Sequence, residues 1–222
     1  MNPTLLTTLT LCIMLATSCE QHSSSTETKP KDMSHLTSDD NRIWFPGNPW
    51  PEGHPIKDFE WTAEVRNGKI WFHLHLETQD YDAERNFDDD QKDYDSDWQA
   101  PIAWNNYHAC TISSTNWHNG GFPFCLLDDY SAESLDGYIA EVDPLPIDPK
   151  ADLNDLAFHT YLLGHDSVAG HRIQFDRRGS TDRFDIIWTG KIALVYAGDY
   201  EYRYDFKAQI LDVELPKPIN SD

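Results

Sequence analysis

The chain has 222 residues, of which 39% are hydrophobic and 13% aromatic, and it carries a formal net charge of -21. This length suits one domain with a leader, and the apolar content is sufficient for a hydrophobic core. The acidic balance argues against a nucleic-acid partner, because binding to phosphates needs Lys and Arg side chains; it favours cations, basic partners or simple solubility in a salty medium.

The first 19 residues, MNPTLLTTLTLCIMLATSC, contain no Asp, Glu, Lys or Arg. The apolar run 5–16 is too short to span a bilayer and ends in small residues, as the h-region of a signal peptide does. The sequence Leu-Ala-Thr-Ser-Cys at 15–19 resembles the lipobox of bacterial lipoproteins. The resemblance implies export, lipidation of Cys19 and anchoring to the cell envelope, with the outer membrane favoured because Glu20, not Asp, follows. Ordinary cleavage after Ser18 is the alternative.

Beyond the leader, residues 20–40 are polar and rich in Ser and Thr, so we expect a disordered tether. We place the folded domain at 41–215 and a short tail at 216–222. The stretch 41–55 mixes three large aromatic residues with four prolines. It predicts an aromatic lead-in that packs on a sheet, not a helix or a central strand. A Trp-bearing ligand loop is the alternative.

Residues 58–78 predict a β-hairpin around Asn67-Gly68, because this dipeptide favours the tight turn of a two-residue hairpin loop. The loop length determines the register. Four facing pairs are apolar and lie on one face of the hairpin: Val65 with Ile70, Ala63 with Phe72, Trp61 with Leu74, and Phe59 with Leu76. The other face pairs Glu64 with Trp71, Thr62 with His73, Glu60 with His75, and Asp58 with Glu77.

The polar face of this hairpin is the best candidate for a transition-metal site. His73 and His75 are two residues apart on one strand and point the same way, Glu77 continues the row, and Glu60 lies opposite His75. Imidazole and carboxylate are common ligands of zinc, iron and copper. The pattern therefore permits a divalent cation as cofactor, although a solvent-facing strand with an ion pair explains it as well.

The acidic stretch 79–98 is a candidate calcium loop. Asp93, Asp95 and Asp97 alternate as at the start of such a loop, but Trp98 stands where an EF-hand requires glycine. A calcium site of another geometry would need several oxygen ligands from this stretch. A solvated acidic loop is favoured, because runs of charge are most often exposed.

Cys110 and Cys125 are the only cysteines after residue 19. In the oxidising compartment that the leader implies, we expect them to form a disulfide that closes a loop of about 15 residues and contributes roughly 3 kcal/mol. Within this loop, Trp117 and His118 belong to an expected exposed turn. Their side chains are candidates for stacking on a sugar, or for covering the disulfide.

The remainder of the chain predicts mainly strands. Strand patterns occur at 158–163, 170–176, 183–189, 191–196 and 200–210, the last with the clearest alternation of apolar and charged residues. A weak helical turn is expected within 131–139. Many short strands with almost no helix indicate an all-β domain, either an antiparallel β-sandwich or a jelly-roll-like arrangement.

The sequence favours a non-enzymatic binding or interaction lipoprotein whose partner is a glycan or a protein. It contains no Gly-x-Ser-x-Gly nucleophile motif and no glycine-rich phosphate loop. Two alternatives remain: a metal-dependent enzyme that uses the polar face of the hairpin, and a structural module stabilised by calcium.

Overall fold

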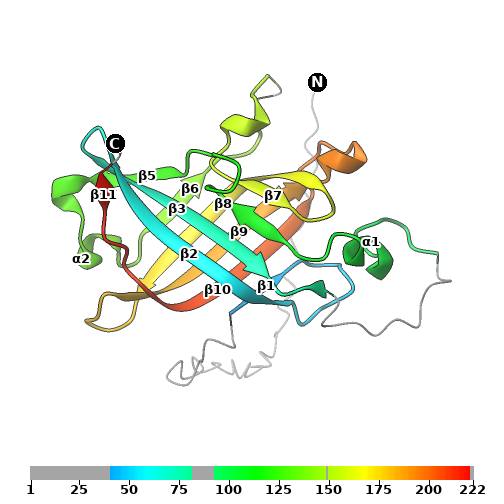
Figure 1. The fold of residues 1–222 in the computed structure, drawn as a ribbon, viewed down its shortest axis with the longest axis horizontal. Coiled ribbons are helices and arrows are strands. Elements are labelled where there is room, and N and C mark those ends of the chain that lie inside the picture. The colour runs from blue at the N-terminus through cyan, green and yellow to red at the C-terminus, as the bar shows by residue number, and fades with distance from the viewer. Residues whose placement is uncertain (1–40, 82–92, 149, 221–222) are drawn as a thin grey trace, which may run out of the picture. The chain divides into compact units, whose positions relative to one another are not determined.

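The computed structural model describes residues 41–81, 93–148 and 150–220, which lie within one compact unit, residues 35–222 (Figure 1). The strands are β1 Arg42–Trp44, β2 His54–Arg66, β3 Lys69–Thr78, β4 Thr111–Ser113, β5 Phe122–Leu126, β6 Ile139–Val142, β7 His159–Tyr161, β8 His165–Arg177, β9 Arg183–Ala193, β10 Tyr204–Glu214 and β11 Ile219–Asn220. The helices are α1 Pro101–Asn105 and α2 Ala132–Leu135, and the 3-10 turns are η3 Leu127–Asp129, η4 Leu153–Asp155 and η5 Val195–Ala197. The all-β prediction is therefore confirmed.

Eight strands close into a barrel in the order β2-β1-β10-β9-β8-β7-β4-β3. Closure depends on β2, which pairs with β3 along one edge and with β1 along the other. A shift of register between Ile56 and Asp58 bends β2 at the point where its partners change. The two-layer sandwich is not confirmed, because one continuous sheet curls round and meets itself.

The β2–β3 hairpin has the register that the Asn67-Gly68 turn predicts. All eight facing pairs occur as expected, from Asp58 with Glu77 to Val65 with Ile70. Both turn residues have positive φ, 51° at Asn67 and 73° at Gly68. The side chains of Ile70, Phe72, Leu74 and Leu76 are fully buried.

Large side chains fill the interior of the barrel. Trp61 on β2 contacts Phe72 on the neighbouring strand, with ring centroids 5.3 Å apart. It also reaches across to Phe175 on β8 at 5.3 Å and Phe184 on β9 at 6.0 Å. Contacts between non-neighbouring strands show that the barrel has a packed core along this section.

The lead-in 41–55 packs as predicted but also contributes a strand. Phe45 and Trp50 are buried, and both surround His54 together with Trp104. The burial of Trp50 is unfavourable for the ligand-loop alternative. The expectation that this stretch lacks a central strand is wrong, because β1 lies between β2 and β10; it ends at Trp44, before the first proline.

The two strands predicted at 183–189 and 191–196 are a single strand in the structure. Residues 183–193 form the continuous strand β9, and the chain then turns through η5. The strand predicted at 200–210 is β10, which begins only at Tyr204, so Tyr200 and Tyr202 precede it. Residues 219–220, within the predicted tail, pair in parallel with β2.

Candidate functional site

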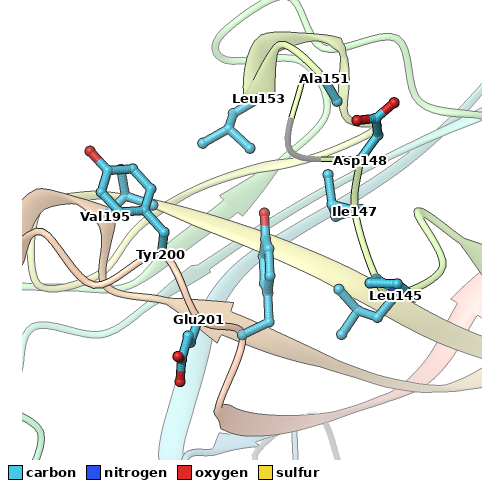
Figure 2. A pocket seen from close by; sticks show the side chains of 10 residues that line it. Leu145, Ile147, Asp148, Ala151, Leu153, Val195, Tyr200 and Glu201 are labelled. Atoms are coloured by element: carbon cyan, nitrogen blue, oxygen red, sulfur yellow. The ribbon is translucent and has the colours of Figure 1, made fainter.

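A cleft of about 850 Å³ lies between the segment that follows β6 and the turn that joins β9 to β10 (Figure 2). In Figure 2, Leu145 and Ile147 lie on one side, and Val195 and Tyr200 on the other. The full lining is Leu145, Pro146, Ile147, Asp148, Ala151, Leu153, Val195, Tyr200, Glu201 and Tyr202. Aliphatic and aromatic side chains predominate, as in sites for small molecules.

The first wall of the cleft leaves the barrel at the edge of β8. That edge pairs with β7 near its start and with β6 further along, and Gly170 lies between the two pairings. Gly170 has φ +62° and donates its N–H to the carbonyl of Asp143 at 2.7 Å. A Cβ at Gly170 would lie 3.0 Å from Cδ1 of Leu145, so glycine allows this wall to approach the barrel closely.

Buried polar contacts hold the second wall. Asp166, only 2% exposed, accepts the N–H of Tyr196 at 3.2 Å and that of Leu163 at 3.1 Å. Burial raises the pKa of the Asp166 carboxyl, and the two N–H groups oppose this shift. Next to it, the hydroxyls of Ser167 and Tyr202 lie 2.6 Å apart. The Tyr202 ring is therefore attached to β8 while it lines the cleft.

The two acidic residues of the cleft lie at its rim and have other partners. Asp148 accepts the N–H of Lys150 at 2.9 Å, and Glu201 is paired with Arg203 at 3.1 Å. In Figure 2 the carboxylate of Glu201 points away from the opposite wall. The walls between them offer mainly apolar surface, so the cleft is suited to binding the apolar part of a ligand.

A second cavity of about 360 Å³ adjoins this cleft and shares Ala151, Leu153 and Val195 with it. His159 and His165 line this second cavity, and Nε2 of His159 lies 3.3 Å from Nδ1 of His165. Burial and the nearby His165 lower the pKa of His159. The ring of Trp117 packs on His159 with centroids 4.6 Å apart.

The hairpin residues predicted to hold a metal pair in the predicted register. The two histidines among them are buried, however, so this part of the strand does not face solvent. His73 and His75 are each only 8% exposed, and Glu60 faces His75 across the strands. Glu77 forms an ion pair with Lys57 at 3.0 Å. Within residues 41–81, 93–148 and 150–220, no group of three or more His, Cys, Asp or Glu side chains is arranged to hold a metal ion.

His73 instead belongs to a hydrogen-bonded cluster. Its Nε2 lies 3.1 Å from both a Glu64 oxygen and a guanidinium nitrogen of Arg66, and its Nδ1 lies 3.4 Å from the Ser114 hydroxyl. Burial is the main reason that the pKa of His73 is lowered. Ser114 is 1% exposed and bonds both the N–H and the carbonyl of Leu74. The Ser114 hydroxyl therefore links its own strand end to the backbone of Leu74, and it is not exposed as a nucleophile would be.

The predicted disulfide is absent, since Cys110 and Cys125 are both free thiols. Cys110 precedes Thr111, which pairs with Glu77, whereas Cys125 precedes Leu126, which pairs with Lys69. These partners are eight residues apart on β3, about 26 Å at roughly 3.3 Å per residue. A disulfide needs Cα atoms within about 7 Å, so the register of β3 keeps the two cysteines apart.

The other predicted site residues are dispersed. Asp93, Asp95 and Asp97 are exposed, and Asp93 and Asp95 line a shallow cavity beside Gly47. Trp117 is half-buried against His159, and His118 is exposed. Cys19 lies outside the described residues.

The cleft residues were not singled out by sequence reasoning. Tyr200 and Tyr202 continue the alternation of β10, so the pattern assigned them to a strand. The sequence signal for a turn before this strand is Gly198. In the structure this glycine has φ +81° and ends the η5 turn. Leu145 and Ile147 lie among prolines in a stretch without periodicity.

No family model matches this chain, and no curated protein or solved structure matches it either. No helix in the described part of the chain is long and apolar enough to cross a membrane.

Proposed function

We propose that this protein is a non-enzymatic binding protein of the cell envelope that holds a small, largely apolar ligand in the cleft lined by residues 145–148, 151, 153, 195 and 200–202. One observation carries the proposal, namely the 850 Å³ cleft with its aliphatic and tyrosine lining. Its volume falls within the roughly 300–1,000 Å³ of small-molecule sites.

The lining favours an apolar ligand over the glycan or protein partner expected from the sequence. Leu145, Ile147, Leu153 and Val195 have no polar side-chain atoms with which to bind sugar hydroxyls. The two tyrosines add aromatic surface, and Tyr200 is 68% exposed at the mouth of the cleft. A ligand with an apolar body and a polar end fits this arrangement, and an alkyl glycoside would combine it with a sugar.

Fluorescence titration with the apolar dye N-phenylnaphthylamine tests the proposal. We expect dye emission to rise on binding and a competing ligand to reverse the rise. Competitors are fatty acids, alkyl glycosides and unmodified oligosaccharides, which separate apolar from sugar recognition.

Leu145→Glu should weaken dye binding at least about tenfold, because it places a charge in the apolar wall. Leu127→Glu is the matched control, since Leu127 is 42% exposed and Leu145 37% exposed, but Leu127 lies outside the cleft. Equal dye affinity in both variants, or no dye binding at all, would refute the proposed site.

Anchoring through Cys19 is a separate part of the proposal and rests on the lipobox resemblance. We expect labelled palmitate to be incorporated into the natural chain and not into a Cys19→Ser variant. Incorporation into neither chain would leave a secreted protein without a lipid anchor.

The two metal-based alternatives have less support. Both ring nitrogens of His73 already lie within reach of protein groups, which disfavours a metal enzyme on the hairpin. A calcium module built on Asp93, Asp95 and Asp97 predicts a melting temperature that falls when a chelator is added. An unchanged value would remove it.

A further inference from the structure

The β7–β8 turn brings two histidine rings together. His165 faces Tyr161 across the antiparallel pair, and His159 lies two residues before Tyr161 on the same face of β7. His159 and His165 are therefore diagonal neighbours of the two strands. Asp166 stabilises the turn between them by accepting the N–H of Leu163.

The distance between the two ring nitrogens matches one edge of a tetrahedral zinc site. Zinc binds imidazole nitrogen at about 2.0–2.1 Å in tetrahedral geometry, which separates two ligand nitrogens by about 3.3–3.4 Å. The observed separation of Nε2 of His159 and Nδ1 of His165 is 3.3 Å. Two cis ligands of a square-planar or octahedral ion at the same bond length would lie closer, at about 2.9 Å.

We propose that His159 and His165 chelate one Zn²⁺ ion, whose remaining coordination positions face the 360 Å³ cavity. The other residues that line this cavity include no Lys or Arg. The ring of Trp117 packs against His159, while both histidines line the cavity. An ion in the cavity can therefore approach both ring nitrogens.

Water or an added ligand completes the coordination. The nearest buried carboxylate, Asp166, already accepts two backbone N–H groups and remains part of the turn. A zinc ion with fewer than four protein ligands has exchangeable positions, as catalytic and ligand-binding zinc sites do. The shared lining with the larger cleft means that these positions lie next to the site proposed for the apolar ligand, although zinc binding itself does not depend on that proposal.

Metal titration of the full chain tests the inference, in a background with Cys12→Ser, Cys19→Ser and Cys125→Ser, because free thiolates also bind zinc. Cys110 is retained because its side chain is fully buried. Calorimetry with Zn²⁺ should show one ion per chain. Co²⁺ should give the intense visible absorption typical of tetrahedral coordination. His159→Ala and His165→Ala should each weaken zinc binding at least about tenfold, since each removes half of the protein ligands.

His118→Ala and His108→Ala are the matched controls, because both residues are exposed and lie outside this cavity. Their affinity for zinc should equal that of the background chain. Near-ultraviolet circular dichroism would establish that each variant is folded. Absence of zinc binding, binding that persists in the His159→Ala/His165→Ala double variant, or a weak octahedral Co²⁺ spectrum would overturn the proposal. The first of these results would identify the contact as a hydrogen bond between two imidazoles.

Discussion

Gly121 lies directly against His73. It has φ +65°, and a Cβ built on it would lie 2.9 Å from Nδ1 of His73 and would clash with the carbonyl oxygen of Phe72. The neighbouring Gly120 accepts a hydrogen bond from Arg66 through its carbonyl at 2.8 Å. The backbone at Gly121 therefore lies over the His73 ring and contributes to its burial.

Gly121→Ala should therefore lower the free energy of unfolding by about 2–4 kcal/mol, through backbone strain and displacement of the His73 ring. Gly120→Ala is the control, because its Cβ would meet nothing within 4 Å and its φ is not in the left-handed region. It should change stability by less than about 0.5 kcal/mol. Urea unfolding of both variants measures the difference, and equal midpoints would contradict the contact.

His171 should make the domain less stable in acid. It is 2% exposed, its Nδ1 accepts the Trp188 indole N–H at 3.0 Å, and burial lowers its pKa to about 3. An unfolded chain protonates the same ring below about pH 6.5. Its contribution is therefore complete above pH 6.5 and is lost as the pH falls toward 3, by up to about 1.4 kcal/mol per pH unit.

Replacing His171 by Gln should flatten this dependence, even though it lowers stability at neutral pH. The measurement is the free energy of unfolding of both chains at several values between pH 4 and 7, where the difference between them should shrink as the pH falls. His118→Gln, at an exposed position, should leave the curve unchanged. Parallel curves for the natural chain and His171→Gln would show that His171 does not titrate on unfolding.

The hydrogen bond between Ser167 and Tyr202 should contribute to stability and should also hold the Tyr202 ring in the wall of the cleft. Tyr202→Phe removes a hydrogen bond of 2.6 Å and should cost about 1 kcal/mol of stability. It also frees a ring that lines the cleft, so the affinity for N-phenylnaphthylamine should change as well. A double-mutant cycle with Ser167→Ala should give a coupling energy of about 1 kcal/mol. A coupling energy of zero would mean that the two hydroxyls are independent.

Both cysteines should be labelled without prior reduction. Iodoacetamide in denaturant should modify Cys110 and Cys125 quantitatively, as peptide mapping can establish. In the folded protein Cys110 should be protected because it is fully buried, and Cys125 should react slowly because burial raises its thiol pKa to about 11. Labelling in denaturant that requires a reductant would reveal a disulfide and contradict the register of β3.

The sequence by itself determined the β2–β3 hairpin, down to each facing pair. Its information is local, since the Asn67-Gly68 turn sets the register and the period of two sets the buried face. The same kind of pattern indicated β7, β8, β9 and β10 and hence the all-β class. It could not determine closure, because the pairing of β1 with β10 joins segments far apart in the chain.

Only the tertiary structure decided the candidate sites. The cleft combines a proline-rich segment with a turn some 50 residues later, and neither has a periodicity that predicts their meeting. His159 and His165 meet because a tight turn sets two strands side by side, whereas Cys110 and Cys125 are kept apart because β3 pairs with their strands at opposite ends. Local periodicity specifies on which side of a strand a side chain lies. The pairing of strands that are distant in the sequence specifies which other side chains lie next to it.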